Sequence, residues 1–149
     1  IGAHYLFSKG KIKKILIVDL DVHQGNGTAE IFQDDHRVFT FSMHGKSNYP
    51  FKKEISDLDI ALADHCNDES YLKELYYHLP QILDRFQADF IFYQSGVDVL
   101  SSDKLGRLGL TKEGCKARDS YILKTAYENK IPIAISLGGG YSARLSDIM

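Results

Sequence analysis

The chain has 149 residues, of which 44% are hydrophobic and 26% charged, a balance that fits one globular domain or a large part of one and excludes a disordered tail. Its formal net charge of −2 gives no electrostatic reason to expect a nucleic-acid or membrane-surface partner. The two cysteines match no disulfide or metal spacing, no apolar run reaches the ~18 residues of a membrane span, and the start shows no signal peptide. A reducing cytoplasm is therefore the expected location.

The first elements, in chain order, are a strand, a short helix and a second strand. Residues 14–19 (K-I-L-I-V-D) form a near-continuous apolar run, as expected for a strand buried on both faces of a parallel sheet. A helix is predicted over residues 27–33. Residues 37–43 (R-V-F-T-F-S-M) are rich in β-branched and aromatic residues, which predicts the second strand.

Two longer helices alternate with the remaining strands. Apolar residues at three- and four-residue spacing predict a helix over residues 69–87, which Pro80 would kink or divide. A third strand follows over residues 89–94 (D-F-I-F-Y-Q). The last helix spans residues 111–129, with Thr111 as a suitable N-cap.

A fourth strand is predicted over residues 131–137 (I-P-I-A-I-S-L). The alternation of strands and helices favours an α/β fold, with a mostly parallel sheet flanked by helices and with functional residues at the carboxyl ends of the strands. Polar or glycine residues do follow each predicted strand: Asp19, Asp21 and His23; Ser42 and His44; Gly96 and Asp98; and residues 138–141.

Three potential metal ligands, Asp19, Asp21 and His23, occupy alternate positions in V-D-L-D-V-H-Q-G-N-G-T, residues 18–28. Alternate side chains of an extended segment share one side, where two carboxylates repel each other unless a cation offsets their charge. A bound metal is the economical interpretation. The alternative is a polar strand end that leads into a glycine-rich turn, with each carboxylate solvated or capping a helix.

A further carboxylate, Asp98, ends the sequence S-G-V-D after the third predicted strand, which should lie near the first. It could complete an Asp-His-Asp set that leaves a fourth position open for water, as catalytic zinc requires. Asp98 could equally be a helix N-cap or a loop residue.

The sequence S-L-G-G-G-Y, residues 136–141, places three glycines before Tyr141. Glycines let the backbone approach a ligand closely and could present the phenol over a site. A phosphate-binding loop is the rival interpretation, but no Gly-Lys-Ser/Thr follows at the required spacing.

Four motifs together resemble the histone deacetylase family, which includes bacterial deacetylases and acetylpolyamine amidohydrolases. They are D-L-D-V-H-Q-G-N-G-T, S-G-V-D, D-K-L-G-R-L-G-L-T and L-G-G-G-Y, in the family's order and approximate spacing. The resemblance implies the arginase/deacetylase fold and zinc-dependent hydrolysis of acetyl-lysine or a related acetylated amine. Asn26, where some members carry Asp, resembles the class II and class IV branches.

The resemblance also assigns roles to residues of this chain. It implies that Asp21, His23 and Asp98 hold the catalytic zinc and that Tyr141 polarises the acetyl carbonyl. Asp19 would orient an active-site histidine, and the backbone at Gly139 and Gly140 would line the substrate site. A structural potassium ion would use Asp19, Asp21, His23, Ser42 and the backbone of Met43, and a second one carbonyls near Phe32, Asp35 and Val38.

One family feature has no counterpart in this sequence. The resemblance implies a histidine pair upstream of the first strand, whereas this chain begins at Ile1, without Met, inside an apolar, helix-compatible segment, and it stops at Met149 soon after a new segment begins. We therefore expect residues 1–149 to be a partial catalytic domain with impaired activity. Of the other histidines, His44 is expected in a strand-end loop.

Two other functions stay open. The chain could be a non-catalytic deacetylase-like domain that binds an acylated ligand or a partner. It could also be a binuclear manganese ureohydrolase, although that enzyme would want a D-x-D pair around Asp98, where Gly96 and Leu100 stand.

Overall fold

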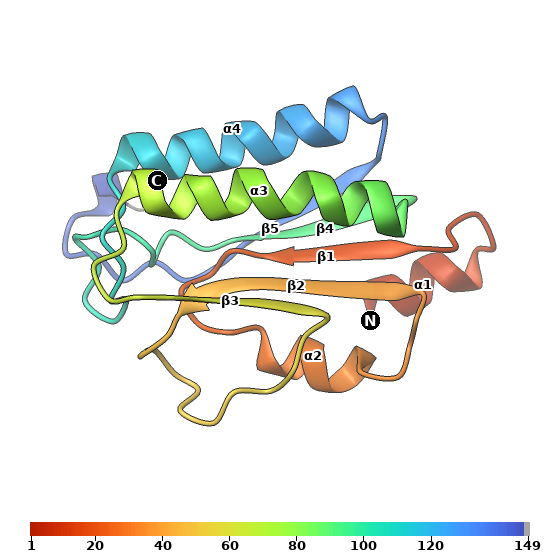
Figure 1. Cartoon of the computed structure of the whole chain (residues 1–149), viewed down its shortest axis with the longest axis horizontal. Helices are drawn as coiled ribbons and strands as arrows, with labels where there is room; N and C mark the ends of the chain where they lie inside the picture. The colour runs from red at the N-terminus through yellow and green to blue at the C-terminus, as the bar shows by residue number, and fades with distance from the viewer. Residues whose placement is uncertain (148–149) are drawn as a thin grey trace.

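A five-stranded, all-parallel sheet forms the centre of the computed structural model, which describes residues 1–147 (Figure 1). The strand order is β3-β2-β1-β4-β5, so the first strand of the chain lies in the middle. The strands are β1 (Ile15–Asp19), β2 (Val38–Gly45), β3 (Leu58–Leu62), β4 (Phe90–Ser95) and β5 (Ile133–Leu137).

Helices cover both faces of the sheet. The long helices α3 (Asp68–Phe86) and α4 (Lys112–Glu128) lie side by side on one face, and the short helices α1 (Gly2–Ser8) and α2 (Asn26–Phe32) pack on the other (Figure 1). A 3-10 turn, Leu145–Asp147, follows β5 along the chain. These elements confirm the predicted α/β fold with a parallel sheet flanked by helices.

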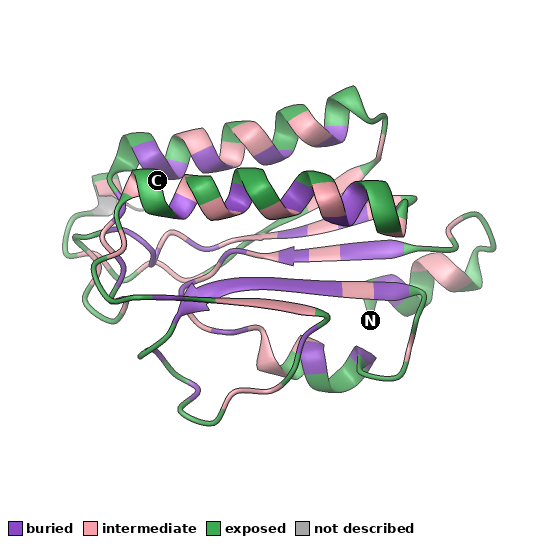
Figure 2. Cartoon of the chain, viewed as in Figure 1, coloured by how far each residue is buried: buried purple, intermediate pink, exposed green. Residues whose placement is uncertain are grey.

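Alternate residues of β1 enter two different hydrophobic clusters, which is why this strand reads as a continuous apolar run. Leu16 and Val18 pack under α3 and α4, whereas Ile15 packs with α1 and α2. Figure 2 shows the same pattern, with β1 and β2 buried along most of their length and the buried stripes of α3 and α4 facing the sheet.

The predicted helix signals have clear structural counterparts. The Thr111 hydroxyl accepts a hydrogen bond from the Gly114 N–H (3.0 Å), which confirms it as the N-cap of α4. Pro80 lies inside α3 without dividing it, because α3 is a single helix of 19 residues.

Two predictions about the strands were wrong. β3 was not predicted because its five residues, L-D-I-A-L, form a short, mostly half-buried edge strand that contains Asp59. His44 was expected in a loop, but it lies within β2 and only 1% of it is exposed, since β2 continues for two residues past Met43.

The register of the sheet places the candidate residues at one edge. Asp19, the last residue of β1, is opposite Ser42 of β2 on one side and Gln94 of β4 on the other. The connections that leave β1 and β4 therefore begin next to each other. Within residues 1–147, no helix is both long and apolar enough to cross a membrane.

Candidate metal centre

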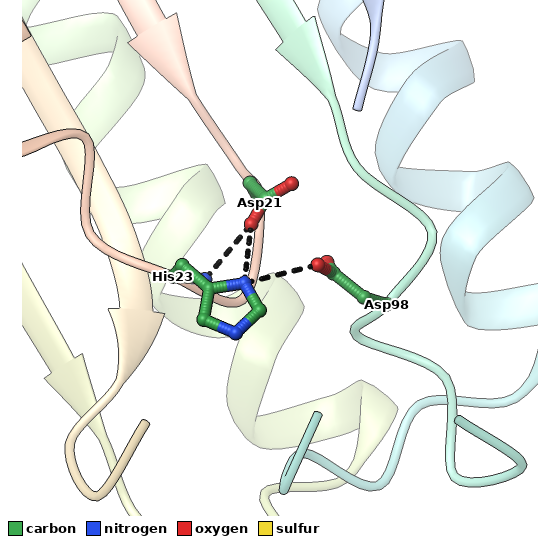
Figure 3. A group of neighbouring side chains, drawn as sticks. All are labelled: Asp21, His23 and Asp98. Atoms are coloured by element: carbon green, nitrogen blue, oxygen red, sulfur yellow. Dashed lines mark hydrogen bonds and ion pairs between the residues drawn. The ribbon is translucent and has the colours of Figure 1, made fainter. Parts of the chain in front are cut away.

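The connection from β1 to α2 places Asp21 and His23 through two local hydrogen bonds. The Asp21 N–H donates to Asp19 Oδ1 (3.1 Å), and the His23 N–H donates to Asp21 Oδ1 (2.9 Å). These bonds form because a carboxylate can accept from the backbone two residues further on. As a result the His23 ring turns back over Asp21, with Nδ1 3.0 Å from Asp21 Oδ1 (Figure 3).

Asp98 reaches the same point from the connection that follows β4. Its Oδ1 accepts a hydrogen bond from the Val22 N–H (2.9 Å), which fixes the carboxylate against the first connection. Its Oδ2 lies 3.2 Å from His23 Nδ1, is buried, and forms no hydrogen bond within the described residues. Figure 3 shows the three side chains converging, and one ligand atom from each lies within 4.8 Å of the others.

The arrangement fits a small cation better than it fits a proton. A single proton on His23 Nδ1 can be donated to only one of the two carboxylates beside it, Asp21 at 3.0 Å or Asp98 at 3.2 Å. A metal ion would satisfy both. Ligands about 2.0–2.1 Å from a tetrahedral zinc lie roughly 3.3 Å from one another, close to these separations.

Burial and mutual repulsion make the carboxylates of this edge hard to ionise without a cation. Burial, followed by the nearby charge of Asp21, raises the pKa of Asp98 to about 7. Burial also raises the pKa of Asp19 to about 7, and the charges of Asp21 and Asp98 add to the effect, although the Asp21 N–H opposes it. A bound cation would therefore lower the electrostatic free energy of the ionised carboxylates in this cluster.

Two glycines allow the backbone to close around the cluster. A Cβ atom on Gly96 would lie 2.7 Å from Asp21 Cα, and one on Gly139 would overlap Asp98 Oδ2. Because Gly139 has no side chain, its N–H reaches Asp21 Oδ2 at 2.8 Å, while its carbonyl accepts from the Val97 N–H (2.7 Å). The loop after β5 is thus attached to both ligand-bearing connections.

Tyr141 is brought to this edge of the sheet but not into the cluster. Its N–H donates to Asp103 Oδ2 (2.6 Å), and its neighbour Ser142 is bonded to Ser102 Oγ (3.0 Å). The side chain is exposed. Within the part of the chain that the structure describes, no hydrogen bond joins its phenol to the three predicted ligands. Gly140 is half-buried between the Gly139 contacts and Tyr141.

The residues predicted to hold potassium are near each other but have other partners as well. Asp19 and Ser42 line one small cavity together with Gly25 and Thr28. Ser42 Oγ also lies 3.0 Å from His44 Nδ1, and Met43 is fully buried in the core. For the second predicted site, Asp35 N–H donates to the Phe32 carbonyl (3.0 Å) and Val38 N–H to the Asp35 carbonyl (2.8 Å).

Two residues of this edge were not singled out from the sequence. Asp103 lies in D-K-L-G-R-L-G-L-T, and its place in that motif was the available signal. Arg118 of α4 is fully buried and donates to the carbonyls of Leu20 and Gly96. No pattern pointed to Arg118, because an arginine in a helix is usually solvated.

Comparison with known proteins agrees with the fold and the motifs. The chain matches the histone deacetylase domain over residues 1–148. It is 44% identical over 149 residues to an uncharacterized protein of Picosynechococcus sp. The aligned region covers 100% of this chain and 50% of that protein. It is 32% identical over 141 residues to Histone deacetylase 2 of Arabidopsis thaliana, covering 93% of this chain and 36% of that protein.

A solved structure, that of an HDAC homolog from Aquifex aeolicus, is similar with a TM-score of 0.79 and 25% identity, covering 93% of this chain and 40% of that one. The chain thus spans half or less of the length of each of these relatives. The likeness confirms the arginase/deacetylase fold expected from the motifs. Sequence, fold and motif order agree, and the chain belongs to the histone deacetylase family.

Proposed function

We propose that this chain carries the metal-binding part of a zinc-dependent deacetylase, which hydrolyses acetyl-lysine or a related acetylated amine. One observation carries the proposal: Asp98 Oδ2 is buried without a hydrogen-bond partner among the described residues and faces His23 Nδ1 at 3.2 Å. A buried, unpaired carboxylate oxygen is costly unless a cation binds it. Asp21, His23 and Asp98 are the residues that would hold the zinc.

In the proposed reaction, the metal and the side chain of Tyr141 have different roles. When bound, zinc acts as a Lewis acid toward a carbonyl oxygen and acidifies a water molecule. Tyr141 would donate a hydrogen bond from its phenol to the acetyl oxygen, where negative charge develops during hydrolysis. Its exposure (48%) leaves the ring accessible to a substrate.

The other predicted residues have supporting roles in this proposal. The backbone at Gly139 and Gly140 would border the acyl group, since Gly139 already contacts Asp21 and permits no side chain near Asp98. Asp19 would orient an active-site histidine. A potassium ion held by Asp19, Asp21, His23, Ser42 and the Met43 backbone would offset the charge at the end of β1.

Proton transfer is the step for which these residues offer least. Among residues 1–147, His23 is the single histidine in the metal-ligand cluster, and it is itself a proposed ligand. Hydrolysis needs a group that takes a proton from water and one that gives a proton to the departing amine. We therefore expect residues 1–149 alone to bind zinc but to turn over substrate slowly. The same observation favours a second candidate, a domain that binds acylated ligands without hydrolysing them.

A binuclear manganese enzyme is less compatible with the site. It would need a second carboxylate two residues after or before Asp98, where Leu100 and Gly96 stand, and a Cβ at Gly96 would lie 2.7 Å from Asp21 Cα. Any side chain at that position would displace a proposed zinc ligand.

The proposal is tested with the protein expressed from its complete reading frame and with residues 1–149 alone. We expect one zinc ion per chain by mass spectrometry of both, and hydrolysis of at least one member of a panel of acylated lysines and polyamines by the complete protein. Two manganese ions per chain would contradict the deacetylase proposal. Tight binding of an acylated amine without turnover by the complete, zinc-loaded protein would favour the non-catalytic candidate.

A further inference from the structure

The guanidinium of Arg118 lies buried between α4 and the ends of β1 and β4. Arg118 is 0% exposed and is the largest of the fully buried side chains in the described part of the chain. It takes part in none of the reaction steps proposed above. Its position therefore needs a separate explanation.

A single nitrogen of this guanidinium connects the two segments that carry the candidate metal ligands. Arg118 Nη1 donates to the Leu20 carbonyl (3.1 Å) and to the Gly96 carbonyl (2.7 Å). Leu20 immediately precedes Asp21, and Gly96 lies two residues before Asp98. One rigid, charged donor thus fixes the backbone beside two of the three ligands at once.

The other charged contact of Arg118 is with the Asp119 carboxylate, which balances the positive charge of the guanidinium but does not connect it to the candidate metal ligands. Its Nε donates to Asp119 Oδ1 (2.8 Å), which also accepts the Tyr93 hydroxyl hydrogen bond (2.5 Å). Arg118 Nη2 and the Tyr71 hydroxyl are buried without hydrogen-bond partners within residues 1–147.

Stability alone gives little reason for an arginine at this place in the core. The desolvation cost of a buried ion pair can exceed its electrostatic gain, and apolar residues of similar volume are often equally stable in its place. The guanidinium nevertheless leaves one of its nitrogens unpaired, although α4 packs against an otherwise hydrophobic cluster. What an apolar side chain could not supply is the bridge between the two carbonyls.

We propose that Arg118 is a positioning residue of the metal centre, which sets the separation of Asp21 and Asp98 by holding the carbonyls of Leu20 and Gly96 together. The inference rests on the proposed zinc site. Arg118 acts through the backbone of both connections and touches neither the metal nor the substrate. Without Arg118, the backbone at Leu20 and Gly96 is no longer held together on the side that faces α4, and the separation of Asp21 and Asp98 becomes less fixed.

The test compares three variants of the protein expressed from its complete reading frame. Arg118→Met removes both carbonyl contacts at similar volume, and Arg118→Lys keeps a charged donor that can reach one carbonyl. Tyr93→Phe is the matched control, because it removes a buried hydrogen bond to Asp119 while leaving the Arg118 contacts with both carbonyls in place. For each variant, the Zn²⁺ dissociation constant is measured against a competing chelator, the melting temperature in excess chelator, and the visible spectrum after loading with Co²⁺.

The expected result is a split between metal affinity and stability. Arg118→Met weakens Zn²⁺ binding on the order of 10–100-fold and changes the Co²⁺ spectrum, Arg118→Lys weakens it less, and Tyr93→Phe lowers the melting temperature without changing Zn²⁺ affinity. A merely structural arginine would lower the melting temperature and leave both metal readouts as in the wild type. That outcome overturns the inference while the proposed function stands.

Two other outcomes are decisive as well. If Arg118→Met does not fold, Arg118→Lys decides, and Zn²⁺ affinity and a Co²⁺ spectrum equal to those of the wild type overturn the inference. If the wild-type protein itself binds no Zn²⁺, the proposed function fails and the role of Arg118 fails with it.

Discussion

The two halves of the candidate site are held in different ways, although both lie at the same edge of the sheet. The metal half, Asp21, His23 and Asp98, lies on the connections that follow the central strand β1 and its neighbour β4, and Asp98 is fully buried. The tyrosine half, Gly139 to Tyr141, follows β5, which within residues 1–147 pairs with β4 alone; Leu137 is 92% exposed and Tyr141 48% exposed. One half is fixed by the core and the other by a few hydrogen bonds near the surface.

This difference matches what each half would do. A metal ion requires ligands at fixed separations, so its residues benefit from buried, doubly anchored backbone. A phenol that donates one hydrogen bond to a substrate can adjust its position when the substrate binds. Metal binding and catalysis should therefore respond to different substitutions, and four predictions test this separation. All of them use the protein expressed from its complete reading frame.

The largest effect is expected from Asp98→Asn. The amide still accepts from the Val22 N–H but loses the charge that faces His23. If the ~10–16 kcal/mol of a structural zinc site is divided over four ligands, the loss of one costs about 2.5–4 kcal/mol, or on the order of 10²–10³-fold in Zn²⁺ affinity. Equilibrium competition with a chelator measures this loss, and deacetylation should fall below detection.

Asp89→Asn is the matched control for this prediction. Asp89 accepts from the backbone N–H of Lys13 and Lys14 at the opposite end of the sheet. Its substitution should leave Zn²⁺ affinity unchanged. An Asp98→Asn protein that binds Zn²⁺ as tightly as the wild type would remove Asp98 from the ligand set.

Tyr141→Phe should separate the two halves most clearly. Loss of the phenol removes a donor to the developing oxyanion, which typically lowers kcat about 10²–10³-fold. Zn²⁺ affinity should stay at the wild-type value, because the backbone contacts of Gly139 and Tyr141 are retained. Steady-state kinetics and Zn²⁺ titration of the same preparation provide both numbers, and equal kcat values would exclude the phenol from the reaction.

A smaller effect is expected from Asp103→Ala, which releases the loop that carries Tyr141. Asp103 accepts from the Tyr141 N–H and from the Leu105 and Gly106 N–H groups. Its loss should lower kcat about tenfold through misplacement of the phenol, without changing Zn²⁺ affinity. Asp147→Ala serves as control, since Asp147 forms an ion pair with Lys112, whose side chain is 51% exposed, and such a partly exposed pair should contribute little. Equal effects of both variants on kcat would argue against an anchoring role.

The smallest effect is a pH dependence of stability that appears only without metal. Asp98 and Asp19 have pKa values raised to about 7 in the folded chain, from 3.8. The folded state therefore binds more protons than the unfolded state between about pH 4 and pH 7, and its stability falls as the pH rises through this window. In excess chelator, the melting temperature should fall by on the order of a few °C more in the wild type than in Asp98→Asn. Saturating Zn²⁺ should remove this difference, and identical pH profiles in chelator would contradict the raised pKa.

Sequence patterns were sufficient for the parts of the fold with strong local signals. Apolar runs identified β1, β2, β4 and β5, and the spacing of D-L-D-V-H together with the strand-end position of Asp98 identified residues that do converge. β3 was missed because a short edge strand needs only partial burial, so its sequence carries no continuous apolar run. The neighbour relation of β1 and β4 followed from the parallel topology rather than from any residue.

The residues that support the site could not be predicted in the same way. Arg118 is typical of a solvated helix position by residue type, and its burial depends on two carbonyls from segments that lie 98 and 22 residues away. Asp103 anchors Tyr141 over a sequence distance of 38 residues. Hydrogen bonds to backbone carbonyl and N–H groups leave no residue pattern, since every residue type offers them.

The long sequence separation between the proposed ligands makes metal binding depend on folding. Val22 and Asp98, which are joined by a hydrogen bond, are separated by 76 residues in the sequence, so the proposed cation site can form only after β4 has paired with β1. A cation that binds only the folded chain stabilises it by about 2.7 kcal/mol when its free concentration is 100 times the dissociation constant. Withholding the metal should therefore lower the proportion of folded protein and speed its proteolysis, in addition to removing the metal that the proposed reaction needs.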